Sequence, residues 1–170
     1  KDMSYYVMPH VFDDADFVQR VTHSFLVREP LASILSYVKL DPDVTLEEIG
    51  SEAEWQHVER LLAGGGKPVV VQSEKIQADP AGQMRRYWQA VGLDDKPQAL
   101  DWGDRPPEDW QQVSGWHQDV MASSSIRPLD AAAEQKSREE FSRLIRTMPH
   151  LQSYLDHHAA FHQRLAEMSI

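Results

Sequence analysis

The sequence predicts an α/β protein with a parallel β-sheet. Residues 21–27 form a short apolar run that is typical of a buried strand, and residues 68–72 form a second run, rich in β-branched side chains. Each run is followed by apolar residues at helical spacing, so strands and helices alternate as in an α/β sheet. With 170 residues and 41% hydrophobic content, we expect a single domain across residues 1–170.

The first strand and helix are predicted on either side of Arg28. Arg28 stands at the end of the first apolar run, and Pro30 suits the first position of a helix, where its missing N–H would have no partner. Helical spacing then separates a packing face from a free face: Leu31, Ile34, Leu35 and Val38 on the first, Ser33, Ser36 and Tyr37 on the second. A guanidinium, a helix N-terminus and hydroxyls could thus converge on one anion, although an ordinary strand–helix unit with a surface arginine has the same pattern.

The second helix and second strand follow a break at residues 41–43. Two possible capping boxes come next, Thr45 with Glu48 and Ser51 with Glu54, and we expect the second to start a helix. The helix has apolar residues at helical spacing, and three consecutive glycines end it before the second strand: Trp55, Val58, Leu61 and Leu62, then Gly64, Gly65 and Gly66.

The remainder of the chain is predicted to be helical on both sides of an irregular segment. Asp79 is expected to cap a helix that has Pro80 at its first position. Residues 94–128 contain several prolines and tryptophans, which indicates a long ordered loop covering a site. Two amphipathic helices, about 131–148 and 150–168, form a helical C-terminal segment over residues 129–170, and the charge run within the first is typical of a solvated helix face.

Composition limits the possible partners. The net charge of −10 argues against a nucleic-acid or anionic membrane surface, and no apolar run approaches the ~20 residues of a membrane span. The absence of cysteine excludes disulfides and thiolate zinc sites and favours an intracellular, cytoplasmic protein. Among the histidines, His158 and His162 are spaced for metal binding, but His158 shares the apolar stripe of its helix. We expect His158 to be a half-buried packing residue, and we expect no metal site.

Arg28, Pro30 and Ser36 together resemble a motif of the PAPS-dependent sulfotransferases, which use 3′-phosphoadenosine-5′-phosphosulfate. In that family, the strand-end arginine and a helix serine eight residues later contact the 3′-phosphate. The resemblance continues in order over residues 1–128, through 68–76, Asp79-Pro80 and the segment with Trp116 and His117, and is strongest to the bacterial branch. It implies a three-layer α/β/α, P-loop NTPase-like fold. It also implies that Arg28, Ser36, Trp116 and His117 bind the cofactor.

The sequence departs from this family at its beginning. A sulfotransferase normally starts with a strand, a phosphosulfate-binding loop and a helix, and no such segment precedes Lys1, which stands in what resembles a strand. We therefore expect these 170 residues to be the C-terminal portion of a longer protein.

The resemblance also suggests catalytic residues. Sulfuryl transfer requires that the donor is held, that the acceptor loses a proton, and that charge on the leaving phosphate is neutralised. Lys1 resembles the family's lysine that reaches the bridging oxygen. Met3 stands where many members have a histidine base.

The candidates for the missing base are Asp2, His10 and His117. We favour His10, because a histidine titrates near neutral pH. The alternative is that His10 is simply a loop residue after Pro9.

The expected function is transfer of a sulfuryl group from PAPS to a hydroxyl of a small molecule or glycan, without a metal. Trp116 either stacks on the adenine, lines the acceptor pocket or anchors its loop. The alternative function is a non-catalytic sulfotransferase-like domain that binds a nucleotide or a partner. Met3 and the missing phosphosulfate loop favour that alternative.

Overall fold

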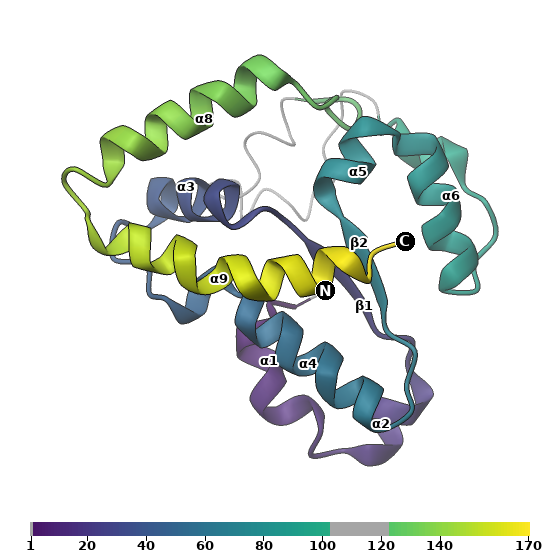
Figure 1. Ribbon diagram of the computed structural model, residues 1–170. Coiled ribbons are helices and arrows are strands. Elements are labelled where there is room, and N and C mark those ends of the chain that lie inside the picture. The colour runs from purple at the N-terminus through teal and green to yellow at the C-terminus, as the bar shows by residue number, and fades with distance from the viewer. Residues whose placement is uncertain (1, 103–122) are drawn as a thin grey trace. The chain divides into compact units, whose positions relative to one another are not determined.

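The computed structural model describes residues 2–102 and 123–170 (Figure 1). The chain divides into two compact units, residues 1–73 with 130–170 and residues 74–129. The described part is a mixed α/β structure that is mostly helical.

The first unit begins with two short helices, α1 (Ser4–Val11) and α2 (Ala15–Arg20). The strand predicted at Lys1 falls outside the described residues, and the chain is helical from Ser4. Partly buried residues of α1 recur at helical spacing, which stabilises a helix instead: Ser4, Val7, Met8 and Val11. Asp14 caps α2 by accepting a hydrogen bond from the Phe17 N–H at 2.9 Å.

The sheet contains two parallel strands among the described residues, β1 (Ser24–Val27) and β2 (Val69–Gln72). The register runs from Ser24 opposite Val69 to Val27 opposite Gln72. The parallel pairing is confirmed, and β1 is shorter than the predicted run over 21–27. The Ile170 N–H donates to the Val70 carbonyl oxygen at 3.0 Å, so the last described residue of the chain lies against β2.

Helix α3 (Pro30–Leu40) follows β1 as predicted, with Pro30 in its first turn. Its predicted packing face is confirmed, since three of the four apolar residues are buried and Val38 is partly buried. These residues form a core cluster with later elements: Leu31, Ile34, Leu35, Val44, Ile49, Phe141 and Leu151. The short 3-10 helix η1 (Glu47–Ile49) supplies Ile49.

Helix α4 (Ser51–Ala63) begins differently from the prediction. Ser51 is the first helical residue and is buried, whereas the cap is Gly50, whose φ of 89° lies in the left-handed region that favours glycine. Ser51 is therefore not the N-cap. Of the earlier predicted box only one half is present: the Glu48 carboxylate accepts hydrogen bonds from the Thr45 N–H at 2.7 Å and the Thr45 hydroxyl at 2.9 Å, whereas the N-cap of η1 is Leu46.

A second core cluster joins α4 to the sheet and to the end of the chain. Its members are Phe25, Val27, Val58, Leu61, Val70 and Leu165. Helix α8 (Ala131–Leu144) and helix α9 (His150–Glu167) are confirmed, with Pro149 between them. Because α9 places Leu151 in the first cluster and Leu165 in the second, it connects both cores.

In the remaining segment, α5 (Ser73–Ala78) follows β2 directly and was not predicted. Helix α6 (Pro80–Ala90) is confirmed, with Asp79 accepting from the Gly82 N–H at 3.0 Å. A 3-10 helix, η2 (Pro97–Leu100), comes next. Most of the predicted loop over 94–128 lies outside the described residues. No helix in the described part is long and apolar enough to cross a membrane.

Candidate functional site

The two parallel strands end at the same edge of the sheet. Val27 and Gln72 are paired at this edge, so Arg28 leaves β1 beside the point where Ser73 leaves β2. Open α/β sheets bind ligands outside the carboxyl ends of their strands. This edge is therefore where the structure positions the predicted anion site.

Arg28 is exposed at this edge, and within the described part of the chain its guanidinium forms no ion pair. Glu29, the N-cap of α3, provides no side-chain cap to the helix, and its carboxylate lies 3.9 Å from the Arg138 guanidinium on α8. The N–H groups of the first turn of α3 thus lack a side-chain acceptor from the N-cap. Such a helix start favours an anion.

Ser36 lies further along α3, on its partly buried side. A helix rises 1.5 Å per residue, so Ser36 is about 9 Å beyond Pro30 along the axis. An anion at the Ser36 hydroxyl would lie beside α3 and not on its N-terminal N–H groups. The Arg28 side chain would therefore have to extend along α3 to share an anion with Ser36.

Tyr37, next to Ser36, connects α3 to the start of the chain. Its hydroxyl donates to the Met3 sulfur at 3.7 Å and shares a hydrogen bond with the Tyr5 side chain. Burial raises the pKa of both phenols, so both are neutral at physiological pH. Met3 thus provides a thioether in contact with a neutral phenol.

The favoured base, His10, lies in the last turn of α1 and not in a loop, so the alternative of a loop residue is wrong. Its ring is 81% exposed, and its Nδ1 atom lies 3.7 Å from the Asp13 carboxylate. No contact in the described part joins His10 to Arg28 or Ser36. Asp2 is exposed. The predicted roles of Lys1, Trp116 and His117 fall outside the described residues.

Sequence reasoning missed two titratable residues on α4. His57 is 5% exposed, and neither ring nitrogen has a hydrogen-bond partner among residues 2–102 and 123–170. Burial lowers the pKa of His57 to about 4, with a smaller contribution from His23. Burial raises the pKa of Glu54 to about 8. The available signal was spacing, because residues 54, 57, 58 and 61 share one face of the helix.

His158 is more deeply buried than predicted. It has no exposed surface, and its Nε2 atom lies 2.8 Å from the Leu46 carbonyl oxygen, to which it donates. Burial lowers the pKa of His158. Its neighbour His157 places Nε2 2.8 Å from the Glu52 carboxylate. Over residues 2–102 and 123–170, no group of three or more histidine or carboxylate side chains could hold a metal ion.

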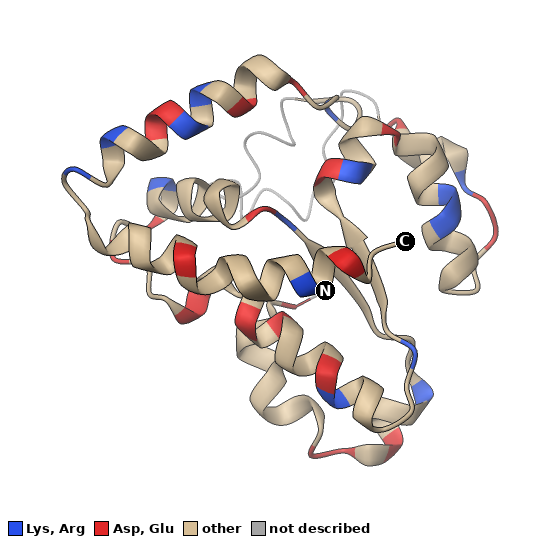
Figure 2. Ribbon diagram, viewed as in Figure 1, with Lys and Arg blue, Asp and Glu red and all other residues tan. Residues whose placement is uncertain are grey.

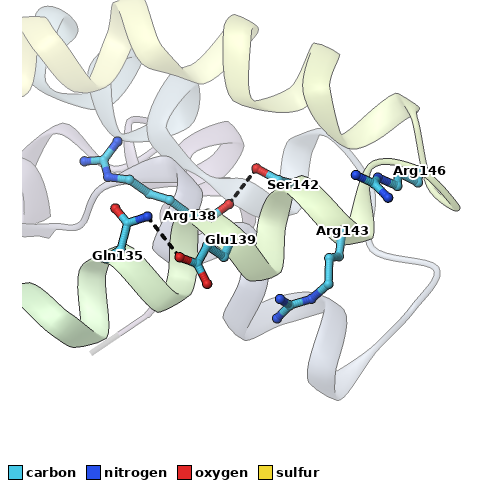
Figure 3. A pocket seen from close by; sticks show the side chains of 6 residues that line it. All are labelled: Gln135, Arg138, Glu139, Ser142, Arg143 and Arg146. Atoms are coloured by element: carbon cyan, nitrogen blue, oxygen red, sulfur yellow. Dashed lines mark hydrogen bonds between the residues drawn. The ribbon is translucent and has the colours of Figure 1, made fainter.

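A shallow hollow beside α8 is lined by three arginines, Arg138, Arg143 and Arg146. Five residues of this helix and Arg146, in the turn after it, line the hollow: Gln135, Arg138, Glu139, Ser142, Arg143 and Arg146. Figure 3 shows that the three guanidinium groups point in different directions, and Gln135 donates to Glu139 at 3.1 Å. All six side chains are exposed, which agrees with the solvated helix face that the charge run predicts.

Comparisons of this chain with protein-family models, with curated proteins and with solved structures found no match. The sulfotransferase resemblance thus depends on the motif residues in their structural setting.

Proposed function

We propose that this chain is a PAPS-dependent sulfotransferase that transfers a sulfuryl group to a hydroxyl of a small molecule or glycan. Arg28 and Ser36 would bind the 3′-phosphate of the cofactor. The two strands and their helices would belong to a three-layer α/β/α fold of the P-loop NTPase type. The observation that carries the proposal is the Arg28–Ser36 motif on a strand and helix at the carboxyl edge of a parallel pair.

The chemistry of the residues at this edge suits a phosphate. Arg28 is a planar donor without an ionic partner in the described part, and α3 begins without a side-chain cap. When bound, PAPS would supply the activated sulfuryl group. The chain would hold the phosphate with Arg28 and orient it with the Ser36 hydroxyl.

The second candidate is a sulfotransferase-like domain that binds the nucleotide without catalysis. The setting of the proposed base favours it, because the His10 side chain is 81% exposed and paired with Asp13. The Met3 thioether cannot accept a proton at neutral pH, and it contacts Tyr37.

Calorimetric titration with adenosine 3′,5′-bisphosphate tests the binding step. Arg28→Ala removes a charge-assisted contact, and we expect it to weaken binding by about 10- to 100-fold. Ser36→Ala removes one neutral hydrogen bond, and we expect a loss of about 3- to 10-fold. Arg143→Ala, on the exposed face of α8, is the matched control and should bind like the wild type.

Failure of the wild type to bind the nucleotide would contradict both candidate functions. Binding that survives both substitutions would contradict the assigned site. Transfer of radiolabelled sulfate to a panel of hydroxyl acceptors then distinguishes the enzyme from the non-catalytic domain.

A further inference from the structure

The N-terminal arm, which we define as residues 4–20, has little stability of its own. Neither α1 nor α2 contains a buried residue, and Pro9 removes one hydrogen-bond donor within α1. Figure 2 shows no charged residue on α1, and its exposed Tyr6 is 67% accessible. Helices of eight and six residues are marginal in isolation. The position of the arm therefore depends on the surface beneath it.

That surface is one face of α4. The Phe12 ring meets the His57 ring edge-on at a centroid distance of 5.2 Å, and the Arg60 guanidinium lies 4.2 Å from the Phe12 ring centroid. At the other end of the face, Tyr5 lies beside Gly50, where a Cβ atom would be 4.0 Å from the Tyr5 ring. The arm thus covers α4 from its cap to its third turn.

The covered face carries two titratable side chains, three residues apart, without a hydrogen-bond or ionic partner among the described residues. Both His57 ring nitrogens are buried without a partner, and the ring is surrounded by aromatic rings at 4.9–5.3 Å. Glu54 is one turn after Gly50 and one turn before His57, so it shares the helix face that lies between the Tyr5 and Phe12 contacts. Its side chain is partly buried, and burial raises its pKa to about 8. Each side chain is therefore most compatible with this face in its neutral form.

The other titratable and charged groups around this face do not neutralise either residue. On α1 and in the turn after it, these groups are Tyr5, Tyr6, His10 and Asp13. The others are Tyr37 on α3, Glu48 on η1, His23 before β1 and Arg60 on α4 itself. Glu48 accepts hydrogen bonds from Thr45, and His10 pairs with Asp13. Arg60, the basic side chain of this group, lies over Phe12.

We propose that the N-terminal arm is a pH-responsive strap, which covers α4 most tightly when Glu54 and His57 are both uncharged and loosens when either one ionises. Loosening would uncover the face of α4 that the arm now occupies. The strap would also move His10 and the contact between Met3 and Tyr37. This inference does not require the proposed sulfuryl transfer, since it concerns only the docking of the arm.

The two side chains respond to pH in opposite directions. Burial in the fold raises the pKa of Glu54 from 4.5 to about 8, so the stability that this burial contributes is complete below pH 4.5 and is lost as pH rises to 8. Burial lowers the pKa of His57 from 6.5 to about 4, so its contribution is complete above pH 6.5 and is lost as pH falls to 4. The arm provides part of this burial through Phe12, so its docking follows the same two titrations. We expect the tightest docking between these limits, near mildly acidic pH.

The loss should be larger on the alkaline side. Below pH 6.5, protonation of Glu54 offsets much of the destabilisation that comes from charging His57. Above pH 6.5, His57 is neutral in both states, so nothing offsets the ionisation of Glu54.

Hydrogen exchange with mass spectrometry on the whole chain measures the docking directly. We would compare protection factors, which correct for the intrinsic pH dependence of exchange, for residues 4–20 and for α9 at pH 4, 5.5, 7 and 9. The arm should lose protection on the order of tenfold between pH 5.5 and 9. Helix α9 should keep its protection. Unchanged protection of the arm over this range, or parallel loss in α9, would overturn the proposal.

Two variants separate the two titrations. In Glu54→Gln the arm should stay protected at pH 9 and lose protection at pH 4. In His57→Leu it should stay protected at pH 4 and lose protection as pH rises. Glu59→Gln, on the exposed side of α4, and His150→Gln, exposed on α9, should keep the wild-type profile.

If α9 loses hydrogen-exchange protection in His57→Leu, that substitution has disturbed the core. The smaller change His57→Gln is then used in its place. A Glu54→Gln profile identical to the wild type would overturn the proposal, because it would show that this carboxyl does not control the arm.

Discussion

Helix α4 packs against α9 on one side and against the N-terminal arm on the other, and the two sides differ in how they treat polar groups. On the α9 side, Glu52 lies 2.8 Å from His157, and the Arg164 guanidinium lies 5.3 Å from the Trp55 ring centroid. Each side therefore has an arginine over an aromatic ring, but only the α9 side pairs its carboxylate with its histidine, whereas Glu54 and His57 on the arm side have no such partner in the described part.

This difference shows why similar residues contribute differently to stability. A buried polar group that makes its hydrogen bond contributes modestly, whereas one without a partner keeps its desolvation penalty. His158 and His57 are both buried, yet only His158 has an acceptor, the Leu46 carbonyl oxygen. We thus expect substitutions on the α9 side to destabilise the fold, and neutral substitutions on the arm side to remove pH sensitivity.

The largest effect is expected for His158→Ala. The substitution leaves a cavity where the side chain has no exposed surface, and it deprives the Leu46 carbonyl oxygen of its donor. We expect a loss of about 3 kcal/mol in the free energy of unfolding, measured by urea denaturation at pH 7. His150→Ala, on the exposed surface of the same helix, is the control and should change it by less than about 0.5 kcal/mol. Equal effects of the two would contradict the structural role of His158.

The second-largest expected effect is a stabilisation, from a substitution on the arm side. Glu54→Gln should stabilise the chain by about 1–2 kcal/mol at pH 9, because an ionised Glu54 destabilises the docked arm. This gain in the free energy of unfolding is limited, because the wild type can release the arm and so avoid most of the cost of an ionised Glu54. Below pH 4.5 the gain should vanish, because the carboxyl is protonated in both states. Urea titrations from pH 4 to 9 measure it, and a gain independent of pH would indicate a cause other than ionisation.

A smaller effect is expected for His57→Leu. At pH 4, the wild type must either hold a charged His57 against three aromatic rings or release the arm, so we expect the variant to be more stable by about 1 kcal/mol. At pH 7, His57 is neutral and the difference should be within about 0.5 kcal/mol, since an apolar side chain replaces ring nitrogens that lack partners. If His57→Leu lowers the free energy of unfolding at both pH values, the contacts of the His57 ring contribute more to stability than its ionisation costs.

The same contrast explains which parts could be predicted from the sequence. Helix α3 has a proline at its start and one clear apolar stripe, and α9 has an apolar stripe behind Pro149, so both were predicted correctly. The helices of the arm were missed because they depend on contacts with α4, whose residues are distant in sequence. Helix α5 was missed because its six residues contain no apolar stripe.

The candidate site was only partly visible from the sequence. Spacing correctly placed Arg28 after a strand and Ser36 on the following helix. It did not reveal that Gly50, not Ser51, caps α4, since the left-handed φ of a glycine is a tertiary outcome. Nor did it reveal that His57 is buried without a partner, because the rings that surround it come from three other segments.

The smallest effect tests the paired side of α4. The side chains of Glu52 and His157 are 37% and 35% exposed, so water weakens their interaction. A double-mutant cycle with Glu52→Gln and His157→Gln should give a coupling free energy of about 0.5 kcal/mol at pH 6. The cycle Gln56→Ala with Glu52→Gln, one turn along the exposed surface, provides the comparison for a hydrogen bond from a neutral donor to the same carboxylate. A coupling near zero would mean that packing of α9, and not this pair, distinguishes the two sides of α4.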